Sequence, residues 1–238
     1  QAFCQRLCGE NVLPPERLEA CTRTLLALNG SDRFAAPPDE VTPDGEAATE
    51  YSWLPYVESF GLSALAGQDA AGALPVWERT VRTAGQQGQR PCDTRLMYRP
   101  TTGEPSWGSY YMTAPASWLV YEALLDVFFR PAEGVLRFAP ALGGASAVVH
   151  PHFWGVGQRD GANVRLEVRR VFGDPALQVT ELEVPEAHGA VSIDGETLAR
   201  TGTFGRYARF RLPEAVALAP GGALAWTVER PPQDVSSA

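Results

Sequence analysis

The 238-residue sequence lacks lysine, so all 20 of its basic residues are arginine, which indicates a GC-rich genome rather than a mechanism. Acidic residues outnumber them at 28, and the formal net charge is -8. An acidic chain repels a phosphate backbone, so we expect no nucleic-acid partner. Long apolar runs are also missing. None approaches the roughly 18 residues of a membrane helix, and we expect no transmembrane segment.

Cysteine is scarce, with only Cys4, Cys8, Cys21 and Cys92. Cys4 and Cys8 are one helical turn apart and would share one face of a helix. A zinc site needs a second pair of ligands at close spacing, and the two remaining cysteines are far apart. We therefore expect plain buried thiols and no metal site. A disulfide stays open at this point.

Motifs for cofactors and for common nucleophiles are absent as well. The sequence has no phosphate loop, dinucleotide fingerprint or nucleophile elbow, and we expect no cofactor. His150 and His152 alternate along a predicted strand and so share one side of it. Without a third ligand, the two histidines do not predict a metal site.

The first part of the chain has helical periodicity. Residues 14–30 begin at proline and end on Asn-Gly, which predicts a helix. A loop rich in Pro, Asp and Gly follows over residues 31–49, and loops of this length are often functional. The apolar stretch 51–67 predicts a buried helix, 70–88 an amphipathic helix, and 115–129 the last long helix.

After residue 130 the pattern changes to short alternating stretches between Gly, Pro and Asp turns. This alternation is typical of β-strands, and regular short strands favour an antiparallel β-sandwich over residues 131–238. We expect Trp154 and Trp226 to be buried in it. With a helical domain over residues 1–130, the predicted fold class is an α + β multidomain chain.

Carboxylates and aromatic side chains gather at two predicted loop-to-helix junctions. The first junction holds Glu50 and Trp53, and the second holds Glu104 and Trp107. Aromatic faces stack on sugar rings, and carboxylates accept hydrogen bonds from sugar hydroxyls. A core tryptophan and a solvated loop glutamate are the alternative interpretation of either junction alone. Two such junctions at the same end of successive helix pairs favour a carbohydrate site.

The order of "LPPERLEACTRTLLALN", "GEPSWGSYYMTAPASWLVYEALL" and "EGVLRFAPAL" resembles the C-terminal part of glycoside hydrolase family 116, over roughly residues 1–142. The resemblance implies that residues 1–130 are the C-terminal portion of an (α/α)6 barrel. It also implies a retaining hydrolase acting on β-glycosides. The first three residues match the family element just after the acid/base. Both catalytic carboxylates would then lie upstream, and no catalytic residue is expected in this chain. The implied partners are a carbohydrate substrate and the N-terminal remainder of the same enzyme.

The same resemblance implies a set of substrate-binding residues. Glu104 matches a family glutamate that contacts sugar hydroxyls, and Glu50 and Trp53 match, with a slip of one residue, a Glu-x-Trp element in the preceding helix. Trp107 would form a wall of the sugar pocket. The family arginine nine positions after the glutamate is replaced by Thr113, which removes a fork of hydrogen-bond donors, so glucose specificity does not follow. The alternatives are another (α/α)6 enzyme, such as a disaccharide phosphorylase or rhamnosidase, and a non-catalytic carbohydrate-binding module.

Overall fold

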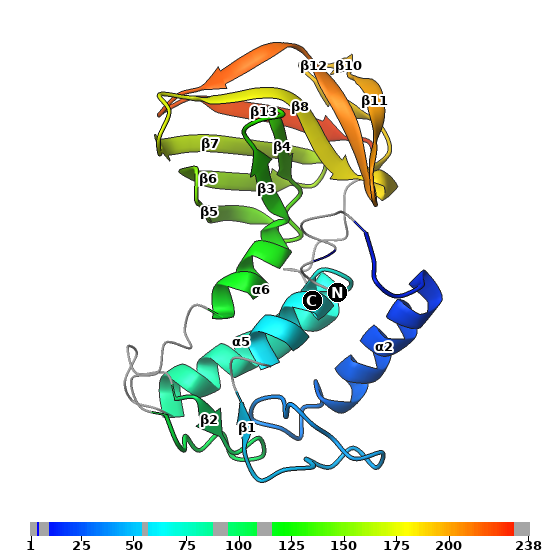
Figure 1. Ribbon diagram of the computed structural model, residues 1–238, viewed down its shortest axis with the longest axis vertical. Coiled ribbons are helices and arrows are strands. Elements are labelled where there is room, and N and C mark those ends of the chain that lie inside the picture. Colours follow the sequence, from blue (N-terminus) through cyan, green and yellow to red (C-terminus); the bar gives the residue numbers. More distant parts are fainter. Residues whose placement is uncertain (1–3, 5–9, 54–56, 88–94, 109–115, 231–238) are drawn as a thin grey trace. The chain divides into compact units, whose positions relative to one another are not determined.

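The computed structural model describes residues 4, 10–53, 57–87, 95–108 and 116–230. The chain divides into two compact units, drawn in Figure 1. The first, here the helical unit, contains Gln1–Ala2 and Leu13–Leu124, and the second, the sandwich unit, contains Phe3–Val12 and Leu125–Ala238. Among the helices that the structure describes, none has the length and apolar character to span a membrane.

Two helices of the helical unit follow the sequence pattern. Helix α2 (Pro15–Leu28) starts with proline in its first turn, which confirms the helix expected over 14–30. Helix α5 (Ala70–Gln87) confirms the one expected over 70–88. Its start is capped by Asp69, whose Oδ1 accepts a hydrogen bond of 2.9 Å from the Gly72 amide. Such a cap satisfies an amide that has no partner within the helix.

The predicted buried helix over residues 51–67 is wrong at its start. Ser52–Trp53 forms strand β1, which pairs antiparallel with β2 (Met97–Tyr98). Helical structure begins later, as a π-helical turn η1 (Val57–Leu62) followed by the short helix α4 (Ser63–Ala66). Pairing with a distant strand overrides the helical periodicity here, because local propensity is weaker than tertiary contacts.

The helix predicted over 115–129 is also too long. Helix α6 (Ala116–Leu125) ends one residue before Asp126, which has a positive φ of 45°. Strand β3 (Val127–Arg130) follows and pairs with β4 (Val135–Phe138). Its Val-Phe-Phe sequence favours a strand, because β-branched and aromatic side chains pack well on a pleated sheet.

The (α/α)6 barrel implied by the family resemblance is wrong. In the part of the chain that the structure describes, the α-helices are α2, α4, α5 and α6. These do not form the six helical hairpins that such a barrel needs, and most of the regular structure is β-sheet. The α + β class with a barrel is therefore replaced by a small helical unit and a larger unit of two sheets.

Two sheets build the sandwich unit, and they lie one over the other in Figure 1. One has five strands, in the order β11 (Ala199–Phe204), β12 (Tyr207–Leu218), β8 (Leu177–Pro185), β4 and β3. The other has six, in the order β10 (Glu196–Thr197), β9 (Val191–Ile193), β13 (Ala223–Val228), β7 (Asn163–Val171), β6 (Phe153–Asp160) and β5 (Gly144–His150). The arrangement is sandwich-like, but β4 and β8 pair parallel.

The core lies between the facing sides of the two sheets. Phe138 of β4 meets Trp226 of β13 edge to face, with ring centroids 6.2 Å apart. The Phe138 ring also lies where a β-carbon on Gly157 would be, so only glycine fits at this position of β6. Trp226 is 3% exposed, as expected, but Trp154 is 48% exposed, and the prediction of a buried Trp154 is wrong.

A buried ionic ladder crosses the five-stranded sheet. Arg137 of β4 and Arg209 of β12 flank Glu183 of β8 in register. The Arg137 Nη2 and Nε donate to one Glu183 oxygen at 2.9 and 3.2 Å, and Arg209 Nε donates to the other at 2.9 Å. Arg130 of β3 donates to that second oxygen as well. Since Arg137 is 0% and Glu183 1% exposed, water does not screen these contacts.

A second carboxylate extends this ladder. The hydroxyl of Tyr207 donates to Asp126 at 3.0 Å, and the Arg137 guanidinium lies 3.7 Å from the centre of the Tyr207 ring. Burial, with the nearby Asp126 charge acting in the same direction, raises the pKa of Tyr207 to about 12. Tyr207 therefore stays neutral and donates a hydrogen bond to Asp126 across the physiological range.

We expect Glu183→Gln to destabilise the sandwich unit strongly. The amide would leave three guanidinium groups next to a neutral side chain, and breaking a buried ion pair on one side costs about 3–5 kcal/mol. Glu186→Gln is the matched control, because Glu186 is exposed and its contact with Arg200 should contribute less than about 1 kcal/mol. Urea unfolding followed by circular dichroism measures both. Equal losses for the two variants would contradict a dominant role for Glu183.

A histidine makes the sandwich unit sensitive to acid. His188 is buried at the end of the turn η2 (Glu186–His188). Burial lowers its pKa, and the charges of Arg159 and Arg206 act in the same direction, while a hydrogen bond with the Arg230 backbone and the Asp126 charge oppose them. The unfolded chain then binds the proton more readily than the folded chain does. The free energy of unfolding should therefore fall as pH drops below about 6.5, the ordinary histidine pKa.

His188→Gln tests this dependence, because glutamine does not titrate. We expect the wild-type chain to lose more unfolding free energy than the variant between pH 7 and pH 5. Urea titrations at each pH give both curves, and the carboxylates that also titrate in this range are common to both proteins. Parallel curves would show that His188 does not carry the effect.

Candidate functional site

A two-stranded sheet in the helical unit, with a single β-bridge on the free side of β2, brings the two predicted junctions together. Strand β2 pairs with β1 on one side, with Trp53 opposite Met97. On its other side, Tyr98 forms a bridge with Pro105. The Met97 amide also donates to the Trp107 carbonyl at 3.2 Å. Segments that lie about 50 residues apart in the sequence thus flank one central strand.

A tight hairpin places Glu104 opposite Arg99. The Gly103 amide donates to the Arg99 carbonyl at 2.8 Å, and the Arg99 amide donates to the Glu104 carbonyl at 2.9 Å. Gly103 has a φ of 73°, a left-handed conformation that strongly favours glycine. This pattern is a G1 bulge, in which two residues on one side of the hairpin, Gly103 and Glu104, together oppose one residue on the other side, Arg99.

The inner face of this sheet is fixed to the long loop 31–49. Ser52 and Tyr98 are buried. The Tyr98 hydroxyl donates to the Pro37 carbonyl at 2.5 Å, and the Ser52 hydroxyl accepts from the Asp39 amide at 3.2 Å. Neighbouring residues of a strand point to opposite faces, so Trp53 and Arg99 are on the outer face.

Four side chains form what we call the Arg99 cluster: Glu50, Tyr51, Arg99 and Glu104. The Arg99 Nη1 lies 2.5 Å from Glu50 Oε1, and Nε lies 3.2 Å from Glu104 Oε2. The Nη2 atom donates to the Tyr51 hydroxyl at 2.8 Å. The guanidinium carbon also lies 4.8 Å from the centre of the Tyr51 ring. One arginine therefore joins carboxylates from both predicted junctions.

Two indoles lie near the cluster, one on the sheet and one next to it. Trp53 on β1 is 36% exposed, and Trp107, whose carbonyl accepts from the Met97 amide of β2, is 61% exposed. The backbone of Trp53 is held by Asp39, whose Oδ2 accepts from the Trp53 amide at 3.1 Å. Of the predicted residues, Trp53 lies on the β1–β2 sheet, and Glu50, Glu104 and Trp107 lie on the loops that flank it, whereas Thr113 lies outside the described residues.

Arg99 was not among the residues predicted from the sequence. Its partner Glu104 follows five positions later, around the turn "RPTTGE". A Gly that must adopt a left-handed conformation in such a short turn is a hairpin signal, and hairpin register would have placed the two side chains opposite each other. The pairing of β1 with β2 had no comparable local signal, because it joins distant segments.

The charge and exposure of the cluster suit a neutral polar ligand. Two carboxylates and one guanidinium leave a local formal charge of about −1. The side chains of Glu50, Arg99 and Glu104 are each more than a third exposed, so a ligand can reach them. The cluster offers fixed acceptors and donors side by side, next to apolar ring surface. Such a surface can bind a molecule that carries many hydroxyl groups.

Cysteine and histidine do not assemble a metal site among the residues that the structure describes. Cys4 and Cys21 are exposed free thiols, so the expectation of buried thiols is wrong for both, while Cys8 and Cys92 lie outside the described residues. The His150 ring stacks on Phe153 at 5.1 Å and lies 5.5 Å from the His152 ring. Both histidines pack with rings.

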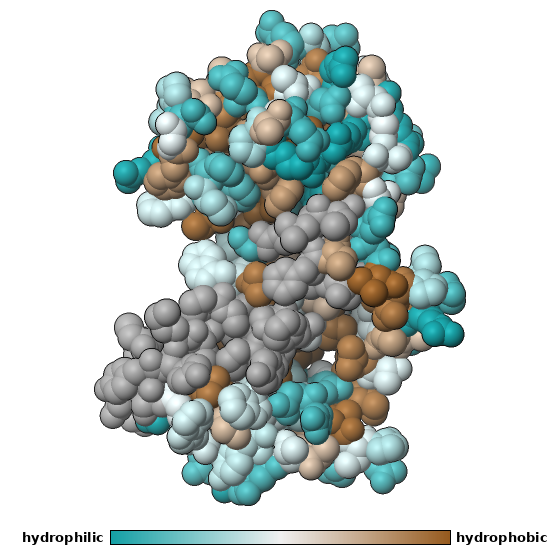
Figure 2. Space-filling model, viewed as in Figure 1, coloured by the Kyte–Doolittle hydropathy of each residue, from teal (hydrophilic) through white to brown (hydrophobic). Residues whose placement is uncertain are grey.

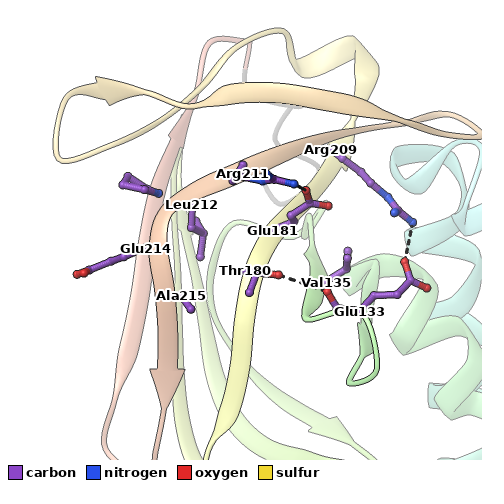
Figure 3. Close-up of a pocket in the computed structure, with 10 residues that line it drawn as sticks. Glu133, Val135, Thr180, Glu181, Arg209, Arg211, Leu212, Glu214 and Ala215 are labelled. Carbon is purple, nitrogen blue, oxygen red and sulfur yellow. Dashed lines mark hydrogen bonds and ion pairs between the residues drawn. The ribbon is translucent and has the colours of Figure 1, made fainter.

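A separate cavity of about 610 Å³ lies on the five-stranded sheet of the sandwich unit (Figure 3). Hydrophilic residues are prominent over this sheet in Figure 2. The cavity forms where Thr180 of β8 is opposed by the four residues 212–215 of β12. Its Arg209 pairs with Glu133 at 3.1 Å, and its Arg211 pairs with Glu181 at 3.3 Å. A charged ligand would have to break one of these ion pairs, which makes the cavity a weaker candidate than the Arg99 cluster.

Comparison with known proteins adds no relative. No protein-family model matches the sequence. No curated protein is similar enough to it to count as a relative.

Gly103→Ala tests whether the hairpin geometry fixes the site. A side chain in the left-handed region costs about 1–2 kcal/mol, so we expect the helical unit to lose about that much free energy of unfolding. Gly202→Ala is the matched control, because a β-carbon at Gly202 would meet open space and Gly202 has no positive φ. Urea unfolding compares the two variants. A loss as large in the control would contradict the role of the bulge.

Proposed function

We propose that the chain binds a saccharide through the outer face of the β1–β2 sheet. The carboxylates of Glu50 and Glu104 accept hydrogen bonds from sugar hydroxyls, and Arg99 donates to sugar oxygens. The indoles of Trp53 and Trp107 supply apolar surface for the carbon side of a sugar ring. The observation that carries this proposal is the Arg99 guanidinium, which lies between two exposed carboxylates beside a sheet that carries Trp53 and is hydrogen-bonded to the backbone of Trp107.

Several features favour a neutral saccharide over other ligands. The local charge of about −1 disfavours phosphate and carboxylate ligands. The long side chains are already ordered by their ion pairs, which reduces the entropy that a ligand must overcome on binding. Tryptophan and arginine are also common in protein–protein contacts. Carboxylates next to an arginine suit a sugar better than a protein partner, because every sugar hydroxyl can donate a hydrogen bond to a carboxylate and accept one from the guanidinium.

A wider role is also proposed: the chain serves a glycoside hydrolase that acts on β-glycosides. The order of the family-like motifs, from "LPPERLEACTRTLLALN" to "EGVLRFAPAL", supports this role. The proposed role does not depend on an (α/α)6 barrel, which the described residues do not form. No residue of this chain is proposed as a catalytic carboxylate. Hydrolysis of aryl β-glycosides by a protein that contains this chain tests the role, and binding without hydrolysis would limit the chain to a binding module.

Arg99→Ala and Glu104→Gln should weaken saccharide binding. Each change removes a charge-assisted hydrogen bond, which contributes roughly 1.5–3 kcal/mol. We therefore expect Kd to rise about ten- to a hundredfold. Isothermal titration calorimetry with β-glucosides and β-xylosides measures the change. Glu19→Gln is the control, because Glu19 is an exposed carboxylate on α2 whose i,i+4 ion pair lies on the helix surface.

Trp53→Ala and Trp107→Ala complete the test. Both should weaken binding, and Trp107→Ala should leave the free energy of unfolding nearly unchanged because Trp107 is the more exposed indole. If Arg99→Ala, Glu104→Gln and Trp107→Ala all bind every tested glycoside as the wild-type chain does, the outer face of the β1–β2 sheet is not the saccharide site.

A further inference from the structure

The outer side of the six-stranded sheet carries its own row of accessible side chains. Burial alternates along β6, so Phe153 and Gly155 are buried, whereas Trp154 and Gln158 are exposed. In register, Trp154 lies next to Arg170 of β7, and Gln158 lies next to Arg165. This outer row belongs to the sandwich unit and shares no residue with the Arg99 cluster.

One end of the row opens into a pocket of about 440 Å³. Its polar lining includes Gln158, Asp160, Arg165, Ser192 and Asp194, while Ala225 contributes a small apolar residue. The strands β6, β7, β9 and β13 and the turn after β9 all contribute. Small residues in the middle and long polar residues around them make a cup on an otherwise flat sheet.

The turn after β9 fixes one wall of the pocket. Ile193 pairs with Glu196, so Asp194 and Gly195 form a two-residue hairpin loop. Both have positive φ, 51° and 83°, as a type I′ turn requires. Aspartate and glycine are the residues that tolerate this conformation best. The position of the Asp194 carboxylate is thus set by the backbone and does not depend on a side-chain contact.

The polar groups of the pocket are available to a ligand. Within the described part of the chain, no hydrogen bond or ion pair engages the side chains of Gln158, Asp160 or Asp194. The nearest carboxylate to the Arg165 Nη2 is that of Glu167, at 3.9 Å. The arginines in the cavity of Figure 3 lie closer to their carboxylate partners, at 3.1 and 3.3 Å.

An aromatic platform lies at the other end of the same row. Trp154 is 48% exposed, and its ring meets Phe172 edge to face at 5.2 Å. The Arg170 guanidinium lies 5.3 Å from the Phe172 ring centre, which helps to order this end. Gln158 lies four positions after Trp154 along the strand, a distance of about 13 Å. That distance is longer than one sugar ring.

We propose that the outer side of the six-stranded sheet binds an oligosaccharide chain. One sugar unit sits in the pocket, with hydroxyls bonded to Gln158, Arg165 and Asp194. A later unit of the same chain stacks on Trp154. This site adds to the one proposed on the β1–β2 sheet and is argued from separate residues.

A neutral, extended ligand fits the row best. The pocket offers an amide, a hydroxyl, a guanidinium and two carboxylates, a mixture of donors and acceptors without a strong net charge. Phosphate-rich ligands meet Asp160 and Asp194 and are disfavoured. A basic peptide could bind these carboxylates, but it would also meet Arg165 and Arg170 along the row. Only an uncharged polyhydroxyl chain gains contacts along the whole length without repulsion.

The test uses the full chain with β-1,4-linked xylo- and gluco-oligosaccharides of one to six units, in calorimetric titrations. All variants are made in the Arg99→Ala background, which removes the other proposed site. We expect affinity to rise with chain length. Trp154→Ala should weaken hexasaccharide binding about tenfold and leave monosaccharide binding unchanged. Arg165→Ala should weaken both by about tenfold.

Arg200→Ala is the matched control, because Arg200 is exposed on the other sheet, lines neither cavity and should leave binding unchanged. Persistent binding in the Arg99→Ala background that Trp154→Ala weakens would support this site even if the β1–β2 proposal fails. No oligosaccharide binding in that background would overturn the inference. Affinity without length dependence, or tighter binding of an oligolysine probe than of the hexasaccharides, would also overturn it.

Discussion

The buried carboxylate of Glu183 is the contact on which the five-stranded sheet depends. It receives hydrogen bonds from Arg130, Arg137 and Arg209, which come from β3, β4 and β12, while Glu183 itself belongs to β8. Four neighbouring strands therefore share one charge centre. Burying a carboxylate is costly unless its oxygens are fully engaged. Planar guanidinium groups meet this need better than ammonium groups because they donate in a fixed fork, and this chain has only arginine as its base.

The Arg99 cluster also consists of ion pairs between guanidinium and carboxylate groups, but here one arginine lies between two carboxylates, and the groups are exposed instead of buried. There a single guanidinium lies between the carboxylates of Glu50 and Glu104, and all three side chains are open to solvent. Exposed ion pairs contribute little to stability, since water and salt screen them. Their effect is to hold polar groups in a defined geometry. Burial thus turns one kind of contact into a structural support, and exposure turns it into a binding surface.

The parts of the fold that local signals determine were predictable. Helices α2 and α5 follow from their proline or aspartate starts and their periodicity. The stretch around Ser52 was predicted as helix because its strand partner lies far away in sequence. The stretch around Val127 was predicted as helix because it continues the apolar run of α6, although its strand partner β4 follows directly in the chain. The barrel came from the resemblance alone, and the described residues do not form it. Glu50 and Glu104 were predicted from their positions beside tryptophan at two expected loop-to-helix junctions and from the family resemblance, but the arginine that joins them needed the hairpin register, which only Gly103 indicated.

Trp154 and Trp226 show why residue type alone could not locate the surfaces. Both lie on central strands, and both indoles look like core residues in the sequence. Side chains alternate between the two faces of a strand. Trp226 occupies a position of β13 that faces the other sheet, whereas Trp154 occupies a position of β6 that faces solvent. Which alternate residues face the core is set by sheet packing and by the register shift between β6 and β7 next to Trp154. An exposed tryptophan that the fold does not need for its core leaves ring surface free. That free surface, beside unpaired polar groups, distinguishes the outer side of the six-stranded sheet from the ion-paired five-stranded one.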